Sequence, residues 1–143
     1  MRGVRHLLFY FSSIFSSLRL EGKNLKLINL YMSNQEPPIY RSAYELTLSI
    51  SRFVKDCHAS YKLTLGHLLQ KEVLQMEATI YHANDQADKS LALQTALDSC
   101  YFIRIIVRLF LDLNIMKLET NIDLNLKIDE TARQLVGWKK SLQ

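Results

Sequence analysis

The sequence predicts an all-α protein, an antiparallel up-down-up-down bundle of four helices. Glycine and proline are scarce, with four Gly and two Pro in 143 residues. A β-sandwich or a doubly wound sheet needs far more turn residues than that. Four long segments instead repeat apolar side chains at helical spacing, and the polar connections between them are short, which is typical of an antiparallel bundle.

The first two helices are predicted over about 38–56 and 64–84. Pro37 or Pro38 suits the first turn of the first helix, where a missing backbone N–H costs nothing. Thr64 is placed as the N-cap of the second helix, which ends near Asn84. Gly66 is expected at a close helix crossing or in a first turn. The apolar stripes are Ile39, Ala43, Leu46, Ile50, Phe53 and Val54 in the first helix, and Leu65, Leu69, Val73, Met76, Ile80 and Ala83 in the second.

The third helix, over about 89–113, carries apolar residues around more than half of its circumference. A helix in a monomeric bundle needs one apolar stripe of roughly 100°, so a second apolar face predicts contact with another subunit. One face holds Leu93, Ala96, Cys100, Ile103, Val107 and Leu111, and the other holds Leu91, Phe102, Ile106, Leu109 and Leu113.

The fourth helix, over about 117–141, also has more apolar residues than one buried stripe requires. Its main stripe is Leu124, Ile128, Ala132, Leu135, Trp138 and Leu142, and a smaller patch of Ile122, Leu126 and Val136 lies toward the opposite side. The predicted oligomer interface therefore consists of Phe102, Ile106, Leu109, Ile122 and Leu126.

Charge divides the chain into an N-terminal extension, 1–31, and a bundle domain, 32–143. The extension has five Lys and Arg residues against Glu21, which leaves 13 basic and 13 acidic residues for the rest of the chain. An apolar stretch from Leu7 to Leu18 is too short to span a bilayer. Three interpretations stay open: an upstream extension with the true start at Met32, a signal or membrane-surface segment, or an additional helix or strand.

Residue patterns typical of catalysis are not found in the sequence. There is no glycine-rich phosphate loop, no G-x-S-x-G and no Glu-x-x-His pair of the kind that bundle di-iron sites use. His67 and His82 are about 22 Å apart along one helix, and His58 lies in a loop. Cys57 and Cys100 are interpreted as buried thiols in a reducing cytosol. We expect a cytoplasmic protein that is not an enzyme and has no metal, no cofactor, no small-molecule substrate and no membrane contact.

Basic side chains are the remaining candidates for partner contact. Arg104 and Arg108 are four residues apart, so both guanidinium groups project to one side of the third helix and can grip phosphates or a partner's carboxylates. Asp112, one turn further, can instead reduce Arg108 to a surface ion pair. Lys139 and Lys140 either contact a partner or complement the dipole of the fourth helix.

Several strings together resemble one family. FVKDCHASYKLTLGHLL, MEATIYHAN, IRIIVRLFLDLNI and LVGWKKSL are similar, in order and spacing, to the four-helix-bundle accessory variability determinants of diversity-generating retroelements. They are more distantly similar to bundle proteins encoded in ribosomal-RNA intervening sequences. The resemblance covers about 39–143.

This resemblance implies a non-enzymatic homopentamer, shaped like a short barrel, that binds the retroelement's reverse transcriptase. It further implies contact with template RNA or cDNA during mutagenic copying, and Arg104 and Arg108 match the family's paired arginines. Contact with nucleic acid is expected to be mostly to phosphates. Two alternatives stay open: a bundle of the intervening-sequence type, or a stand-alone relative, without a polymerase partner, and a ferritin-like metal enzyme.

Overall fold

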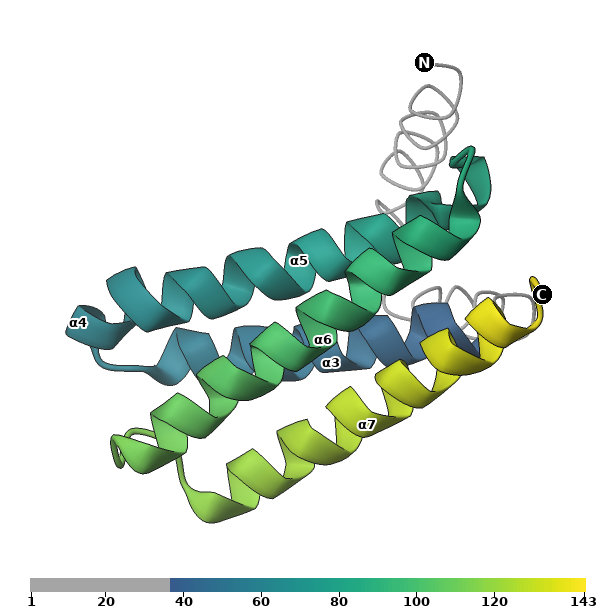
Figure 1. Cartoon of the computed structure of the whole chain (residues 1–143). Coiled ribbons are helices and arrows are strands. Elements are labelled where there is room, and N and C mark those ends of the chain that lie inside the picture. Colours follow the sequence, from purple (N-terminus) through teal and green to yellow (C-terminus); the bar gives the residue numbers. More distant parts are fainter. Residues whose placement is uncertain (1–36) are drawn as a thin grey trace, which may run out of the picture. The chain divides into compact units, whose positions relative to one another are not determined.

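The computed structural model describes residues 37–143, and this part of the chain is almost entirely helical. Its long helices are α3 (Pro38–Asp56), α5 (His67–His82), α6 (Lys89–Asp112) and α7 (Leu118–Lys140). A short α4 (Ala59–Tyr61) and a π-helical turn (Lys62–Gly66) lead directly into α5. The predicted all-α four-helix bundle is confirmed (Figure 1). The extension 1–31 lies outside the described residues.

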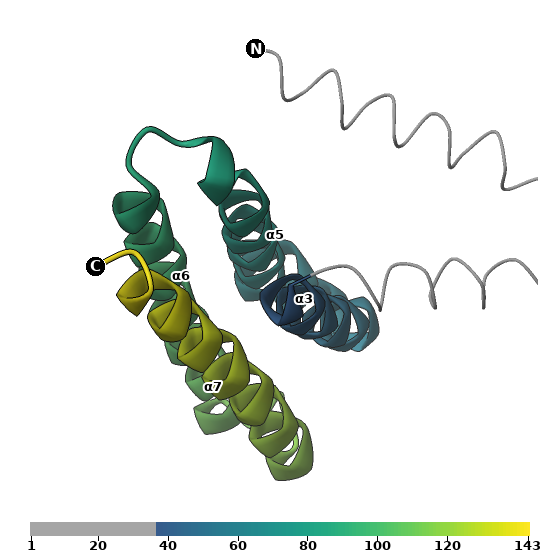
Figure 2. The same ribbon diagram turned by 90° about the vertical axis from the view of Figure 1, so that its right-hand side faces the viewer.

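Each long helix packs against the two that neighbour it around one core. α3 packs on α5, α5 on α6 and α6 on α7, and α7 returns to α3, which Figures 1 and 2 show from two directions. The core includes residues of all four helices, and Phe110 of α6 meets Phe53 of α3 edge to face, with ring centroids 5.0 Å apart. Because each helix has neighbours on two sides, its outward face is the part that the bundle leaves uncovered.

The predicted bounds of three helices agree with the structure to within one residue. Pro38 stands in the first turn of α3, as expected. The capping of the second helix differs from the prediction. Thr64 is not an N-cap, because the helical segment already begins at Ala59 and His58 caps it, its Nδ1 accepting a hydrogen bond from the backbone N–H of Ser60. The Thr64 hydroxyl donates to the carbonyl of Ser60 at 2.9 Å.

Gly66 lies in the π-helical turn where the chain approaches α3. A Cβ on Gly66 would lie 3.0 Å from the carbonyl oxygen of Tyr61 and 3.2 Å from Cγ1 of Val54. The expected close crossing is therefore at this glycine, and its partner is the end of α3.

Gly66→Ala and Gly137→Ala are expected to change stability in opposite directions. At Gly66 the new methyl group must displace backbone, so the free energy of unfolding should fall by about 1–3 kcal/mol. At Gly137 of α7 a Cβ meets nothing within 4 Å, so alanine should raise it by about 0.5–1 kcal/mol. Urea denaturation of both variants followed by circular dichroism measures the difference, and equal effects would contradict the crowding at Gly66.

Candidate functional site

Large apolar side chains line the outward face of α6. Four of them form what we call the α6 apolar face: Phe102, Ile105, Leu109 and Leu113, with exposed fractions of 41%, 63%, 40% and 47%. Isolated exposed apolar residues are ordinary, but contiguous ones on one helix mark a surface that binds something.

Length and composition would also allow α6 to cross a membrane, and among the described residues it is the one helix that meets this test. Half of the apolar stretch is buried in the bundle. Core helices of soluble bundles share this property.

Ile106, one of the predicted interface residues, is not part of this face. It is 3% exposed and belongs to the core. Ala92 and Thr95 show which flank of α6 borders α5, because they line a groove together with Gln75 and Thr79 of α5. Ile106 follows Thr95 by about three turns and so lies on the same flank. α5 therefore covers Ile106, and Ile105 takes the outward position.

A second apolar face lies on the first half of α7. Leu118, Ile122 and Leu126 form this α7 apolar face, with exposed fractions of 61%, 51% and 64%. Ile122 and Leu126 were predicted to be interface residues, and both are available for contact. The residues that follow on the same side of α7 are mostly polar.

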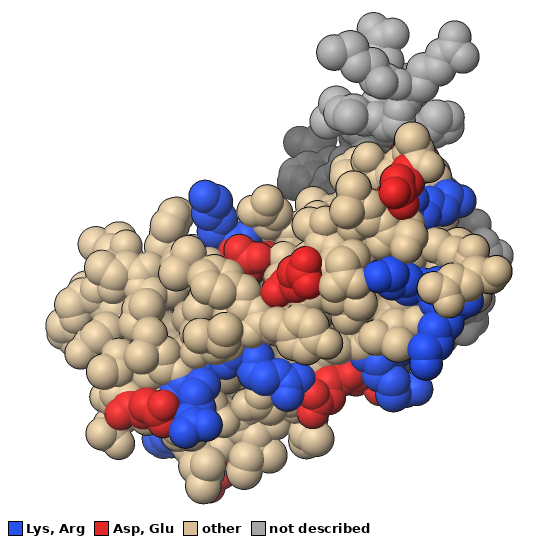
Figure 3. Space-filling view, viewed as in Figure 1, with Lys and Arg blue, Asp and Glu red and all other residues tan. Residues whose placement is uncertain are grey.

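The predicted cationic pair lies where α6 borders α7, and both arginines are engaged by carboxylates. Arg104 forms an ion pair with Asp129 of α7, and Arg108 forms one with Asp112 at 3.1 Å. Figure 3 shows Lys and Arg gathered with Asp and Glu along this border. A phosphate would have to compete with these carboxylates for either arginine.

The two lysine candidates lie toward the other end of α6. Lys139 donates to Oε1 of Gln94 at 2.6 Å, while Lys140 is exposed in the last turn of α7. Gln94 precedes Arg104 by ten residues, or about 15 Å along α6. The structure thus spreads the predicted cations along the α6–α7 border and does not gather them into one anion site.

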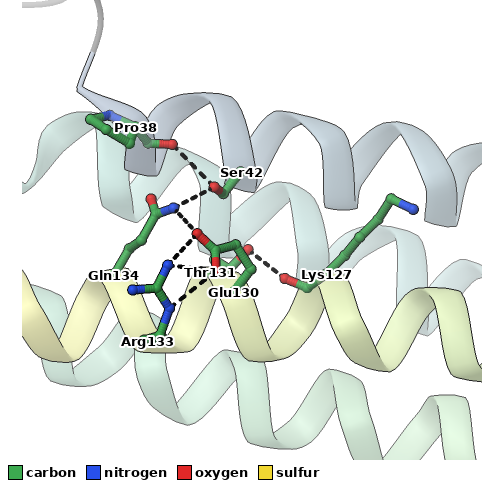
Figure 4. A network of polar contacts seen from close by, with 7 residues as sticks. All are labelled: Pro38, Ser42, Lys127, Glu130, Thr131, Arg133 and Gln134. Atoms are coloured by element: carbon green, nitrogen blue, oxygen red, sulfur yellow. Dashed lines mark hydrogen bonds and ion pairs between the residues drawn. The ribbon is translucent and has the colours of Figure 1, made fainter.

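Polar contacts fix the seam between α3 and α7 (Figure 4). Gln134 donates to the hydroxyl of Ser42 at 2.8 Å and to Glu130, and Arg133 donates to Glu130 at 2.7 Å. These hydrogen bonds lower the pKa of the Glu130 carboxyl, with that from Arg133 contributing most. Glu130 therefore stays ionised and holds the exposed Arg133 at the outer side of α7.

The titratable residues of 37–143 do not converge on a reactive centre. Within this range no three His, Cys, Asp or Glu side chains are grouped closely enough to hold a metal ion. Burial raises the pKa of the Cys100 thiol to about 12, although Arg104 partly opposes the shift. The thiol contacts the sulfur of Met76 at 3.4 Å. Cys100 is thus a protonated core residue at neutral pH, and its nucleophilic thiolate is scarce.

Open grooves also lie on the described part of the chain, and two of them are lined as follows. One, of about 510 Å³, lies between α5 and α6 and is lined mostly by small or uncharged side chains, with His82 and Asp88 at its edge. The other, of about 440 Å³, lies between the start of α3 and the end of α7, where Trp138 and Tyr40 face it. Neither groove brings together a set of acid, base and nucleophile.

Comparison of the chain with models of known protein families and with curated proteins finds no match.

Three residues of the two apolar faces were not predicted as interface residues from the sequence: Ile105, Leu113 and Leu118. A signal for Ile105 was present, since it follows Phe102 by three residues and precedes Leu109 by four, which is the spacing of a helix–helix seam. Periodicity could not decide between Ile105 and Ile106, because that choice depends on which flank of α6 meets α5.

Proposed function

We propose that this protein is a non-enzymatic accessory scaffold of a diversity-generating retroelement, which assembles into a homopentameric ring and binds a reverse transcriptase in the cytoplasm. The observation that supports this proposal is the pair of apolar faces on α6 and α7, exposed outside a core that is already complete. A single bundle gains nothing from exposing these side chains to water, whereas burying them between copies is favourable by about 25 cal/mol per Å².

Binding, and not catalysis, is the role that this surface supports. Its prominent side chains are apolar, and the charged groups beside them form ion pairs with one another. Contact with the polymerase is assigned to the border of α6 and α7, because Arg104 and Arg108 each hold a carboxylate there. A carboxylate of the polymerase can replace Asp112, since an exposed ion pair contributes under about 1 kcal/mol.

The double substitution Arg104→Ala with Arg108→Ala is expected to abolish co-purification with a reverse transcriptase encoded beside this protein's gene. Removing both guanidinium groups leaves the facing carboxylates of the polymerase without a partner. The matched control is Arg41→Ala with Arg52→Ala on α3, which should still co-purify. Full retention by the α6 variant would contradict the assignment of the contact.

Any binding of RNA or cDNA is expected to depend steeply on salt and little on sequence. Phosphate contacts release counterions, so contacts by the four predicted cations should lower affinity by about 10² between 50 and 200 mM salt. Fluorescence anisotropy with two unrelated RNAs over that range measures the slope. A complex that is insensitive to salt, or selective for one sequence, would refute phosphate contact.

A second candidate is a bundle of the intervening-sequence type, or a stand-alone relative, without a polymerase partner. The observation that favours it is the charge balance along the α6–α7 border, where Asp112 and Asp129 neutralise the two arginines. The neighbourhood of the gene separates the candidates, because a reverse-transcriptase gene beside it supports the first and a location within a ribosomal-RNA operon supports the second.

A further inference from the structure

The outward residues of α6 and α7 have the same spacing when one helix is followed in the reverse direction. Along α6, one row of exposed positions advances by four, three, four, three, four and four residues, and along α7 one row has the same steps from Lys140 back to Leu118. Other exposed residues lie outside these rows: Tyr101, Arg108 and Asp112 of α6, and Glu119, Asp123 and Gly137 of α7. Alternating steps of three and four keep side chains on one seam between packed helices. The α6 positions are Leu91, Thr95, Asp98, Phe102, Ile105, Leu109 and Leu113. The α7 positions are Leu118, Ile122, Leu126, Asp129, Arg133, Val136 and Lys140.

From this match we infer that copies of the chain join by an antiparallel seam, in which the outward face of α6 in one copy packs on the outward face of α7 in the next. The inference rests on the proposed self-association and names its contact. Followed in opposite directions, the two faces bring three apolar pairs together, and Phe102 faces Asp129. Leu113 meets Leu118, Leu109 meets Ile122, and Ile105 meets Leu126.

Charge complementarity supports the antiparallel orientation. The same register places Asp98 of one copy opposite Arg133 of the other. Within its own chain Asp98 accepts from Gln94 through Oδ1, and Arg133 donates to Glu130 through Nε and Nη2, so Oδ2 and Nη1 are available for this pair. In a parallel orientation that aligns the apolar faces, Asp98 and Arg133 lie beyond opposite ends of the contact and no such pair forms.

The register also suits a closed ring. Within one chain, Arg104 lies level with Asp129 and Gln94 lies level with Lys139. In the proposed seam, the α7 residue that faces a given α6 residue is only two positions away from the one that lies level with it within a chain. The two registers therefore differ by about 3 Å along the helices. In a ring whose axis is parallel to the bundle, the surfaces that meet must lie at the same position along that axis. A large shift along the axis between the two surfaces would produce an open helical filament instead.

The position of the two faces supports closure as well. α6 and α7 are neighbours around the core, so their outward faces are turned by about a quarter turn relative to each other. When copies join through faces at such an angle, each copy is rotated relative to the one before it. The chain of copies therefore closes into a ring after a few of them. Each copy then buries both of its apolar faces.

Cysteine cross-linking of the full chain tests the seam. In a Cys57→Ser background, with Cys100 buried, chains carrying Leu109→Cys are mixed with chains carrying Ile122→Cys and oxidised. We expect a covalent dimer from the mixture and none from either variant alone. Leu109→Cys mixed with Val136→Cys, about 20 Å out of register, is the matched control and should not cross-link.

The remaining outcomes separate this inference from the proposed function. Cross-linking of Leu109→Cys with itself would show that two α6 faces meet, and would overturn the inference while self-association stands. Absence of a cross-link in a protein that light scattering shows to be associated would also overturn it. A chain that stays a single bundle at working concentration refutes the proposed self-association itself.

A charge exchange gives a second readout that does not depend on oxidation. Asp98→Arg is expected to weaken association roughly tenfold or more, because it faces Arg133 with a like charge. Adding Arg133→Asp to the same chain should restore association, and helicity should be unchanged in both variants. Failure of the double variant to recover would contradict the predicted register.

Discussion

Ile106→Asp is expected to destabilise the bundle strongly, whereas Ile105→Asp should leave each bundle stable and separate the copies. Ile106 lies in the core, where a carboxylate has no partner and cannot be hydrated. The free energy of unfolding should fall by about 4 kcal/mol or more, a large part of the roughly 5–15 kcal/mol that a domain possesses. Circular dichroism with urea denaturation measures this loss.

Ile105 is the matched control because it differs by one position and is 63% exposed. There an aspartate remains hydrated in the single bundle, and the free energy of unfolding should change by no more than about 0.5 kcal/mol. Between copies, however, the new charge lies opposite Leu126 and would be buried without a partner. Light scattering should show the mass fall from the assembly to one chain. Strong destabilisation by both substitutions, or by neither, would refute the assignment of the two flanks.

Phe110→Ala is expected to produce the largest loss of stability among simple truncations. Phe110 is fully buried and packs edge to face on Phe53, so truncation removes contacts between α6 and α3 and leaves a cavity. Losses for buried Phe→Ala substitutions are about 3–5 kcal/mol. Thermal unfolding monitored at 222 nm should show a midpoint many degrees lower, since about 1 kcal/mol shifts a domain of this size by several degrees.

Phe102→Ala provides the comparison, because its ring belongs to the α6 apolar face and is 41% exposed. The free energy of unfolding of this variant should change by less than about 1 kcal/mol, while its self-association weakens. A loss at Phe102 equal to that at Phe110 would mean that the α6 apolar face contributes to the core of the single bundle.

The four helices could be predicted from the sequence because their apolar residues recur at helical spacing and few residues interrupt them. The bounds of α3, α6 and α7 could be predicted for this reason. The start of the second helical segment could not, because Thr64 has the chemistry of an N-cap, whereas the segment begins earlier, at Ala59, with His58 as its cap. Local propensity favours Thr64 as a cap and does not indicate this earlier start.

The candidate site could likewise be predicted only in part. Phe102, Leu109, Ile122 and Leu126 were found because apolar side chains on both sides of a helix are visible in the sequence. Whether Arg104 is available could not be predicted, since its carboxylate partner, Asp129, is 25 residues away and on another helix. Asp112 was predictable as the partner of Arg108, because it lies one turn away on the same helix.

By itself, the sequence determined that this protein is a bundle of four helices with more apolar surface than one bundle buries, since helical periodicity is a local property of the chain. Only the tertiary structure decided that Ile105, and not Ile106, is part of that surface. The two residues differ by 100° around α6, and the packing of α5 alone determines which of them is covered.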